Sequence, residues 1–193
     1  EAYLAESAGA VVADDARAPR DLDALARLRQ AVSQAAGHPM IAKLDQDAAS
    51  IGFANRSDAA DISSRGPLTP DHIIRTKRRA VVIGDDPSQN VADSAAEYRA
   101  YFERNKTDGM HCLDPAPRWA IWPGHGIVTF GKHLQETTIV SDIKDHTIRA
   151  IQLAEALGGW TPLPEAELFE MEYWELEQAK LKKAGAAQPV FRG

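Results

Sequence analysis

The 193-residue chain lacks the features of a disulfide-stabilised, membrane-spanning or secreted protein. Its single cysteine, Cys112, excludes an internal disulfide and a Cys-x-x-Cys metal or redox site. No apolar run approaches the roughly 18 residues of a membrane span, and the first residues lack the basic and apolar regions of a signal peptide. These absences predict a cytoplasmic protein that does not act at a membrane.

The chain also contains fewer basic than acidic residues. Lys and Arg number 22 against 28 Asp and Glu, which gives a net charge of -6 and argues against general nucleic-acid binding. A local exception lies at Arg75, Lys77, Arg78 and Arg79, a cluster large enough for one small anion but not for a duplex. With 44% hydrophobic and 26% charged residues, the chain is typical of a packed globular domain.

Several catalytic signatures are missing. The chain contains no Gly-x-Gly-x-x-Gly that opens a helix, no Walker-type loop and no Gly-x-Ser-x-Gly elbow. Its six histidines form no His-x-His, HExxH or helical i,i+4 pair, so a metal site would have to assemble from distant segments. His72 and His125 stand out because each lies in a Gly- or Pro-rich turn beside an expected strand, where a site and a structural role are equally compatible.

Hydrophobic periodicity predicts a layered alternation of helices and strands. Helices are expected over residues 22–32, 91–106, 134–157 and 164–183, and strands over 39–44, 80–84, 118–122 and 126–130. The last helix is expected to bury Phe169, Trp174 and Leu176 and to turn its glutamates to solvent. This order predicts an α/β domain of the α+β layered type.

Two groups of charged residues are candidates for a polar site. Asp71, His72, Arg75 and Lys77 bring a carboxylate, an imidazole, a guanidinium and an ammonium within seven residues, a set that can hold a phosphate or carboxylate. A solvated charged edge is the competing interpretation. The turn at 114–118 carries Asp114 and Arg118 at its two ends. These two residues either bind substrate or form an ion pair with each other.

Three segments together are similar to a known enzyme family. They are TPDHIIRTKR at 69–78, the DPAPR turn at 114–118 that runs on to PGHGIVTFGK at 123–132, and EYWELEQAKL at 172–181. The chain resembles, in order and spacing, the middle of bifunctional aldolase/short-chain dehydrogenases of the rhamnulose-1-phosphate aldolase/alcohol dehydrogenase type. The resemblance implies a class II aldolase/adducin-like sheet flanked by helices, as a full unit or a degenerate or partial one.

The resemblance also implies a domain order. Residues 1–20 would end a preceding aldolase region and link it to the central aldolase-like domain at 21–183, and 184–193 would lead towards a dehydrogenase domain. NAD would bind only in that dehydrogenase. A divalent metal, zinc, would serve the aldolase and is expected in the preceding region, although His125 falls on the position of a zinc-binding histidine of class II aldolases.

Two functions are therefore expected. In the first, the domain belongs to a sugar-phosphate aldolase fused to a dehydrogenase and acts as a homo-oligomer on a small-molecule sugar phosphate. Asp71 and His72 are then the catalytic candidates, His125 the metal candidate, and the substrate-binding candidates are Arg75, Lys77, Asp114 and Arg118. In the second, the domain is a non-catalytic spacer and assembly unit that joins two enzyme units.

Overall fold

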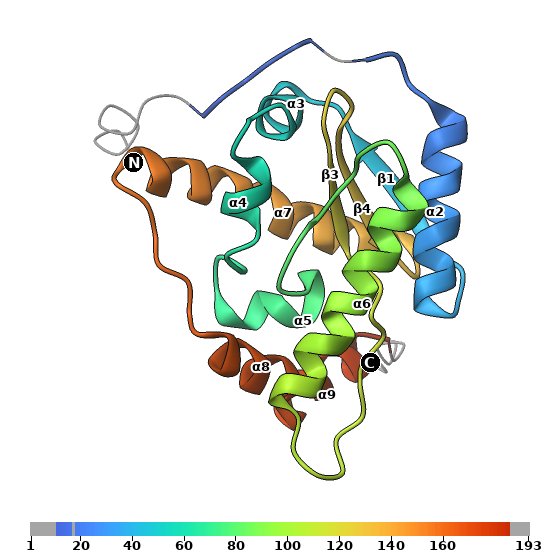
Figure 1. The fold of residues 1–193 in the computed structure, drawn as a ribbon, viewed down its shortest axis with the longest axis vertical. Coiled ribbons are helices and arrows are strands. Elements are labelled where there is room, and N and C mark those ends of the chain that lie inside the picture. The colour runs from blue at the N-terminus through green and yellow to red at the C-terminus, as the bar shows by residue number, and fades with distance from the viewer. Residues whose placement is uncertain (1–10, 17, 186–193) are drawn as a thin grey trace, which may run out of the picture.

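The structure of the protein is a computed structural model, which describes residues 11–16 and 18–185. A four-stranded mixed sheet forms its centre (Figure 1). The strand order is β1 (Ile41–Asp45), β4 (Gly126–Gly131), β3 (Trp119–Trp122) and β2 (Val81–Val82). β4 is antiparallel to both neighbours, whereas β2 and β3 are parallel. Helices lie on both faces of the sheet, which confirms the predicted α/β layered fold class.

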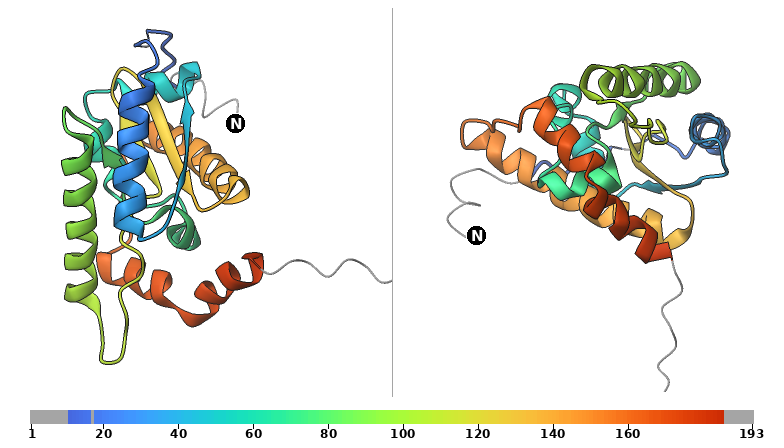
Figure 2. Two further views of the ribbon diagram at one scale, coloured as in Figure 1. Left: turned by 90° about the vertical axis from the view of Figure 1, so that its right-hand side faces the viewer. Right: turned by 90° about the horizontal axis from the view of Figure 1, so that it is seen from below.

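One face of the sheet is covered by α2 (Leu22–Ala36) and α6 (Pro87–Asn105), which lie together on one side of the molecule (Figure 2). Asp21 begins α2 by accepting a hydrogen bond from the Ala24 backbone N–H at 2.8 Å, and Gly37 ends it in the left-handed conformation. Leu28 and Val32 of α2 pack with Val128 and Phe130 of β4 in the core of this face.

The opposite face is covered by α3 (Ala48–Ala54), α4 (Ala59–Ser63) and α7 (Leu134–Ala156). Successive residues of β3 alternate between the two cores, because side chains of a strand point to opposite faces. Trp119 and Ile121 pack on this face with Phe53, Val140 and Ile148, whereas Ala120 and Trp122 belong to the core beneath α2 and α6.

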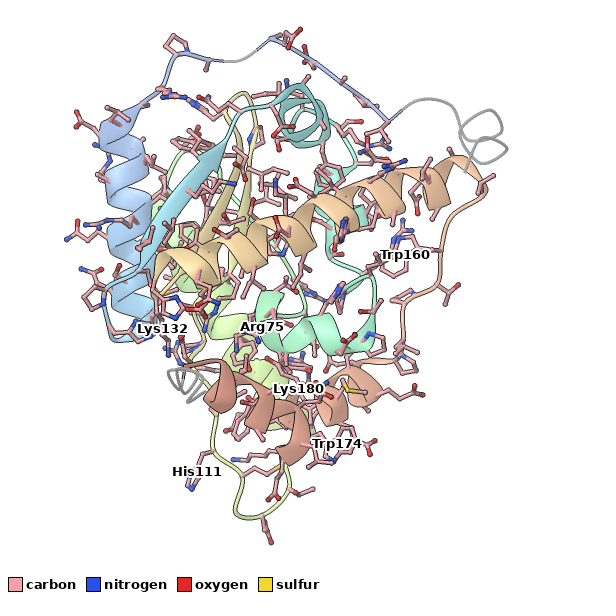
Figure 3. The ribbon with its side chains drawn as sticks, turned by 180° about the vertical axis from the view of Figure 1, so that it is seen from behind. Arg75, His111, Lys132, Trp160, Trp174 and Lys180 are labelled. Atoms are coloured by element: carbon pink, nitrogen blue, oxygen red, sulfur yellow. The ribbon has the colours of Figure 1, made fainter. Side chains whose placement is uncertain are left out.

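The C-terminal helices differ from the prediction of one long helix. α8 (Glu165–Tyr173) ends at Trp174, whose extended backbone (φ -64°, ψ 127°) separates it from α9 (Glu175–Gly185). Phe169 is buried as expected, but Trp174 and Leu176 are 49% and 63% exposed. The expectation that all glutamates face solvent was also wrong, because Glu172 and Glu177 are buried. Figure 3 shows Trp174 at this junction.

The remaining short helices connect the sheet to the C-terminal region. A 3₁₀ turn, η1 (Pro70–His72), leads directly into α5 (Ile73–Thr76), and both contact α8. No helix in the described ranges is long and apolar enough to cross a membrane. Residues 1–10 and 186–193, to which most of the expected flanking segments belong, lie outside the described residues.

Candidate functional site

A buried ion pair joins the first and last of the three segments singled out in the sequence. Lys77, at the end of α5, places its Nζ 3.2 Å from Oε1 of Glu172 on α8. The two residues are 8% and 1% exposed. Tyr98 of α6 donates a hydrogen bond from its hydroxyl to the same Glu172 oxygen at 2.8 Å, and its ring centroid lies 4.0 Å from the Lys77 Nζ. Residues far apart in sequence thus form one compact charged centre.

Tyrosine hydroxyls extend this centre on the α8 side. The Tyr173 hydroxyl lies 3.0 Å from that of Tyr98 and accepts a hydrogen bond from the Leu113 backbone N–H at 3.2 Å. The Tyr101 hydroxyl and Glu172 Oε2 are also buried at this centre, and a side-chain hydrogen bond between Tyr101 and Glu172 is among the causes that raise the pKa of Tyr101.

The backbone at Lys77 is strained. Its φ of 63° and ψ of 175° fall in a region that L side chains rarely adopt, and Lys77 is the one non-glycine residue with positive φ in the described part of the chain. Such a conformation costs on the order of 1–3 kcal/mol and persists where surrounding contacts hold it. The Lys77 N–H still donates to the Ile73 carbonyl at 3.0 Å, so the chain completes α5 before it turns towards β2.

Burial controls the protonation of this centre. Desolvation lowers the pKa of Lys77 although the Glu172 charge opposes the shift. Burial, followed by the Glu172 charge, raises the pKa of Tyr98 and of Tyr101, and burial raises the pKa of Tyr173 to about 12. The hydroxyls therefore remain protonated at neutral pH, while the Lys77 amine loses its proton more readily than an exposed lysine.

A pocket of about 330 Å³ lies between β2 and α6, next to the Lys77–Glu172 pair. Lys77, Tyr98 and Tyr101 line it together with Arg78 and Arg79. Other lining residues include Asn90, Asp93, Ser94, Glu97, Pro115 and Pro117. The pocket thus combines a buried amine with cations, carboxylates and hydroxyl groups.

The two arginines of the pocket differ in how far their charge is neutralised. Arg78 pairs with Glu165 at 2.8 Å and with Glu97 at 3.2 Å, whereas Arg79 lies 3.6 Å from Glu97 and its side chain is 43% exposed. Arg79 therefore has more guanidinium donors open to a ligand.

Of the predicted site residues, the structure brings Lys77 near the turn that carries Asp114 and Arg118. The Arg118 guanidinium donates to Asp114 Oδ2 at 2.8 Å and to the Ala116 carbonyl at 2.8 Å, so these two residues form the internal ion pair. Their charges still act on Lys77: that of Arg118 lowers its pKa and that of Asp114 raises it.

Asp71, His72 and Arg75 lie on η1 and α5, outside the residues that line the pocket. Exposed Asp71 accepts a hydrogen bond from the Thr69 hydroxyl at 2.6 Å, which lowers the pKa of its carboxyl. The buried Nδ1 of His72 has no partner among the described residues. Half-buried Arg75 likewise forms no hydrogen bond or ion pair with a described residue; Figure 3 labels it.

His125 occupies the turn between β3 and β4, at the end of the sheet opposite α8 and α9 (Figure 1). Its ring stacks on Trp122 with centroids 4.1 Å apart, and its Nδ1 is buried without a hydrogen-bond partner. The described residues contain no group of three or more His, Cys, Asp or Glu side chains that could hold a metal. They therefore do not fit a catalytic zinc site, which needs three protein ligands.

The sequence interpretation missed Glu172 and the tyrosines around it. A signal for Glu172 was present, because it follows Leu168 and Phe169 by four and three residues and so shares their buried helix face. The tyrosines of α6 were expected to serve only as core, and no local pattern distinguishes a core tyrosine from one whose hydroxyl meets a buried carboxylate 74 residues away.

A second buried lysine lies on the other face of the sheet. The side chain of Lys144 on α7 is fully buried, and its Nζ lies 3.2 Å from Asp45 Oδ2, 3.3 Å from Ser50 Oγ and 2.5 Å from Asp145 Oδ1. Asp45 is also paired with Lys43 at 2.8 Å. These contacts tie α7 to β1 and α3.

Comparison with known proteins shows the family. A family model described as "Aldolase class II, second domain" matches residues 19–181, so the chain belongs to this class II aldolase family. A protein of Bacillus subtilis (strain 168) named "Uncharacterized oxidoreductase YuxG" is 32% identical over 169 residues. The match covers 81% of this chain but 24% of that protein, so the chain spans about a quarter of this relative's length.

Solved structures of YgbL are also similar. The proteins from Klebsiella pneumoniae and Escherichia coli give TM-scores of 0.47 and 0.45. Each is 18% identical, and each match covers 76% of this chain and 64% of that chain.

Proposed function

We propose that this class II aldolase domain is the central part of a longer enzyme that cleaves a sugar phosphate of the rhamnulose-1-phosphate type and carries an NAD-dependent short-chain dehydrogenase. Family membership supports the aldolase half. The dehydrogenase half is supported by the resemblance in the three segments and by a much longer relative with oxidoreductase in its name. We propose a cytoplasmic homo-oligomer.

In this proposal the domain binds the phosphate of the substrate in the pocket between β2 and α6. The observation that carries it is Arg79, whose guanidinium is half-exposed at the pocket and 3.6 Å from its nearest carboxylate partner. A planar guanidinium with open donors forms strong charge-assisted hydrogen bonds to phosphate oxygens. Lys77 and Arg78 add positive charge to the same pocket.

A second polar contact is proposed on the α5 side. His72 and Arg75 lie on adjoining elements, and the His72 Nδ1 and the Arg75 guanidinium both lack partners among the described residues. With Asp71 they could reach the substrate or a neighbouring subunit. The divalent metal that stabilises the enediolate in class II aldolases is proposed to lie in the preceding region, because the described residues here do not fit it.

Substitution of Arg79 in the longer enzyme tests the phosphate site. Arg79→Ala removes charge-assisted bonds worth about 1.5–3 kcal/mol, which corresponds to a rise in KM for the sugar phosphate of about 10- to 150-fold. Arg149→Ala is the matched control, because Arg149 is exposed on α7. If KM and kcat are unchanged in Arg79→Ala, the substrate phosphate does not bind in this pocket.

The alternative, a spacer and assembly domain, is favoured by a different observation. Lys77, Arg78 and Arg118 each pair with carboxylates of the domain itself. If these pairs serve only to hold the domain together, Arg79→Ala leaves both kinetic constants unchanged, and the two functions are separated by the same measurement.

A further inference from the structure

The pocket between β2 and α6 has two chemically different ends. At one end Arg78 and Arg79 lie 3.2 and 3.6 Å from Oε1 of Glu97 on α6. At the other end the Gly84 backbone N–H, just after β2, donates a hydrogen bond to Asn90 Oδ1 at 2.8 Å. The chain thus runs in opposite directions on the two sides of the pocket, which extends along α6 from a cationic end to an uncharged one.

Two polar side chains line the stretch between these ends. Asp93 and Ser94 belong to the α6 side of the pocket. Gln89 Nε2 donates a hydrogen bond to Asp93 Oδ1 at 2.7 Å, but Asp93 forms no ion pair with a described residue. The Ser94 hydroxyl forms no hydrogen bond within the described part of the chain. An acceptor and a hydroxyl are therefore open to a ligand in the pocket.

We propose that Asp93 and Ser94 form a hydroxyl-binding subsite, which makes the pocket selective for the monophosphate of a short polyhydroxylated chain over a compound that carries a second phosphate. The inference rests on the proposed function, because it takes the phosphate to bind at Arg79. It goes further in assigning the residues that distinguish one phosphorylated compound from another.

The spacing along α6 fits such a ligand. Asp93 and Glu97 are four residues apart, so they lie on the same side of the helix and roughly 6 Å apart along its axis. Arg79 lies beside Glu97. With single bonds of about 1.5 Å, a phosphate at Arg79 followed by a chain of about three carbons reaches the level of Asp93.

The chemistry of the two side chains fits hydroxyl groups. An ionised carboxylate only accepts hydrogen bonds, whereas a serine hydroxyl both donates and accepts. Neighbouring hydroxyls of a ligand can therefore donate to Asp93 and exchange a hydrogen bond with Ser94. Bonds that involve an ionised group are stronger than those between neutral groups, so Asp93 contributes most of the selectivity.

The charges of the pocket disfavour a second phosphate. Lys77 is paired with Glu172 at 3.2 Å, and Arg78 is paired with Glu165 at 2.8 Å as well as with Glu97. Beyond Arg79 the pocket therefore offers no open cation among the described residues. A second phosphate would instead meet the carboxylate of Asp93, and such repulsion between like charges is a means of specificity.

Calorimetric titration of the 193-residue chain with matched three-carbon compounds tests the proposal. Propyl phosphate carries the phosphate alone, sn-glycerol 3-phosphate adds hydroxyls, and propane-1,3-diyl bisphosphate carries a second phosphate in their place. Ionic strength is held constant, because salt screens the charges. Glycerol phosphate should bind about three- to tenfold more tightly than propyl phosphate, which corresponds to a hydrogen bond of ordinary strength. The bisphosphate should bind more weakly than propyl phosphate.

Substitutions of Asp93 separate its hydrogen bond from its charge. Asp93→Ala should lower the affinity for glycerol phosphate to that for propyl phosphate and leave propyl phosphate unchanged. Asp93→Asn keeps an oxygen acceptor without the charge, so it should retain a preference for glycerol phosphate and bind the bisphosphate more tightly than the wild type does. Glu103→Ala is the matched control, because Glu103 is an exposed acid of α6 outside the pocket.

The outcomes distinguish this inference from the phosphate site. Equal affinities of the wild type for glycerol phosphate and propyl phosphate, or equal losses of both in Asp93→Ala, would overturn the hydroxyl subsite. A bisphosphate that binds more tightly than propyl phosphate would contradict the charge selection. Arg79→Ala should weaken the binding of every compound. If Arg79→Ala changes none of them while Asp93→Ala still abolishes the preference, only the phosphate assignment fails; absence of any binding would contradict both.

Discussion

Lys77 and Lys144 are both buried and both paired with carboxylates, but their surroundings differ. Lys144 is fully enclosed between α7, β1 and α3, and both carboxylates and a serine hydroxyl satisfy its charge. Lys77 meets one carboxylate oxygen and an aromatic ring beside a pocket, and its backbone has a positive φ of 63°. Burial and an ion pair are common to both lysines, whereas the positive φ and the neighbouring pocket distinguish Lys77 from Lys144.

The largest expected effect is at Glu172. Glu172→Ala leaves the Lys77 ammonium buried without its anion and removes the acceptor of the Tyr98 hydroxyl. Breaking a buried pair in this way should lower the free energy of unfolding by about 3–5 kcal/mol, measured by urea denaturation. Glu170→Ala, exposed on the same helix, should change it by less than about 0.5 kcal/mol. Equal effects of the two substitutions would contradict the buried pair.

Lys144→Met should follow closely. The expected loss is about 3 kcal/mol, at the low end for breaking a buried pair, because Asp45 keeps Lys43 at 2.8 Å. Lys43→Met serves as the control, since its side chain is 45% exposed and an exposed pair contributes about 1 kcal/mol or less. A loss at Lys144 no larger than that at Lys43 would show that the Lys144 cluster is not the rigid structural counterpart of the Lys77 centre.

Tyr173→Phe tests the hydroxyl network with a smaller, pH-dependent effect. At neutral pH it should cost about 1 kcal/mol for the lost hydrogen bonds to Tyr98 and the Leu113 N–H. The folded pKa of Tyr173 is raised to about 12, so above its ordinary value of 10 the folded state holds a proton that the unfolded state has lost. Rising pH from 10 to 12 should therefore destabilise the wild type more steeply than Tyr173→Phe. If the free energy of unfolding depends on pH in the same way in both proteins, Tyr173 does not take part in this hydrogen-bond network.

The smallest effect is expected at Trp174, two residues from Glu172. A fully buried ring would cost about 3–5 kcal/mol on truncation to alanine. Because Trp174 is 49% exposed between α8 and α9, Trp174→Ala should cost about 1 kcal/mol or less in urea denaturation. A loss above about 3 kcal/mol would indicate that the ring is buried in the complete protein by a surface outside this domain.

The sequence predicted the elements whose signals are local. Asp21, the spacing of Leu28 and Val32, and Gly37 define α2, and the Pro-Gly turn at 123–124 joins β3 to β4 as expected. The break at Trp174 was not predicted, and the partners of Glu172 could not be predicted because Lys77 and Tyr98 lie 95 and 74 residues from it in the sequence. A sequence shows which charged residues are present, but it does not show which cation forms an ion pair with which anion.

The pKa of the Lys77 amine tests the central claim most directly. It can be measured from the pH dependence of the ¹³Cε signal of Lys77 in protein with labelled lysines, assigned by comparison with Lys77→Arg. The account predicts a midpoint below the ordinary lysine value of about 10.4, because desolvation outweighs the attraction of Glu172. A midpoint at or above that of exposed Lys132 would show that Glu172 stabilises a permanent ammonium, and it would contradict the account in which burial controls the protonation of Lys77.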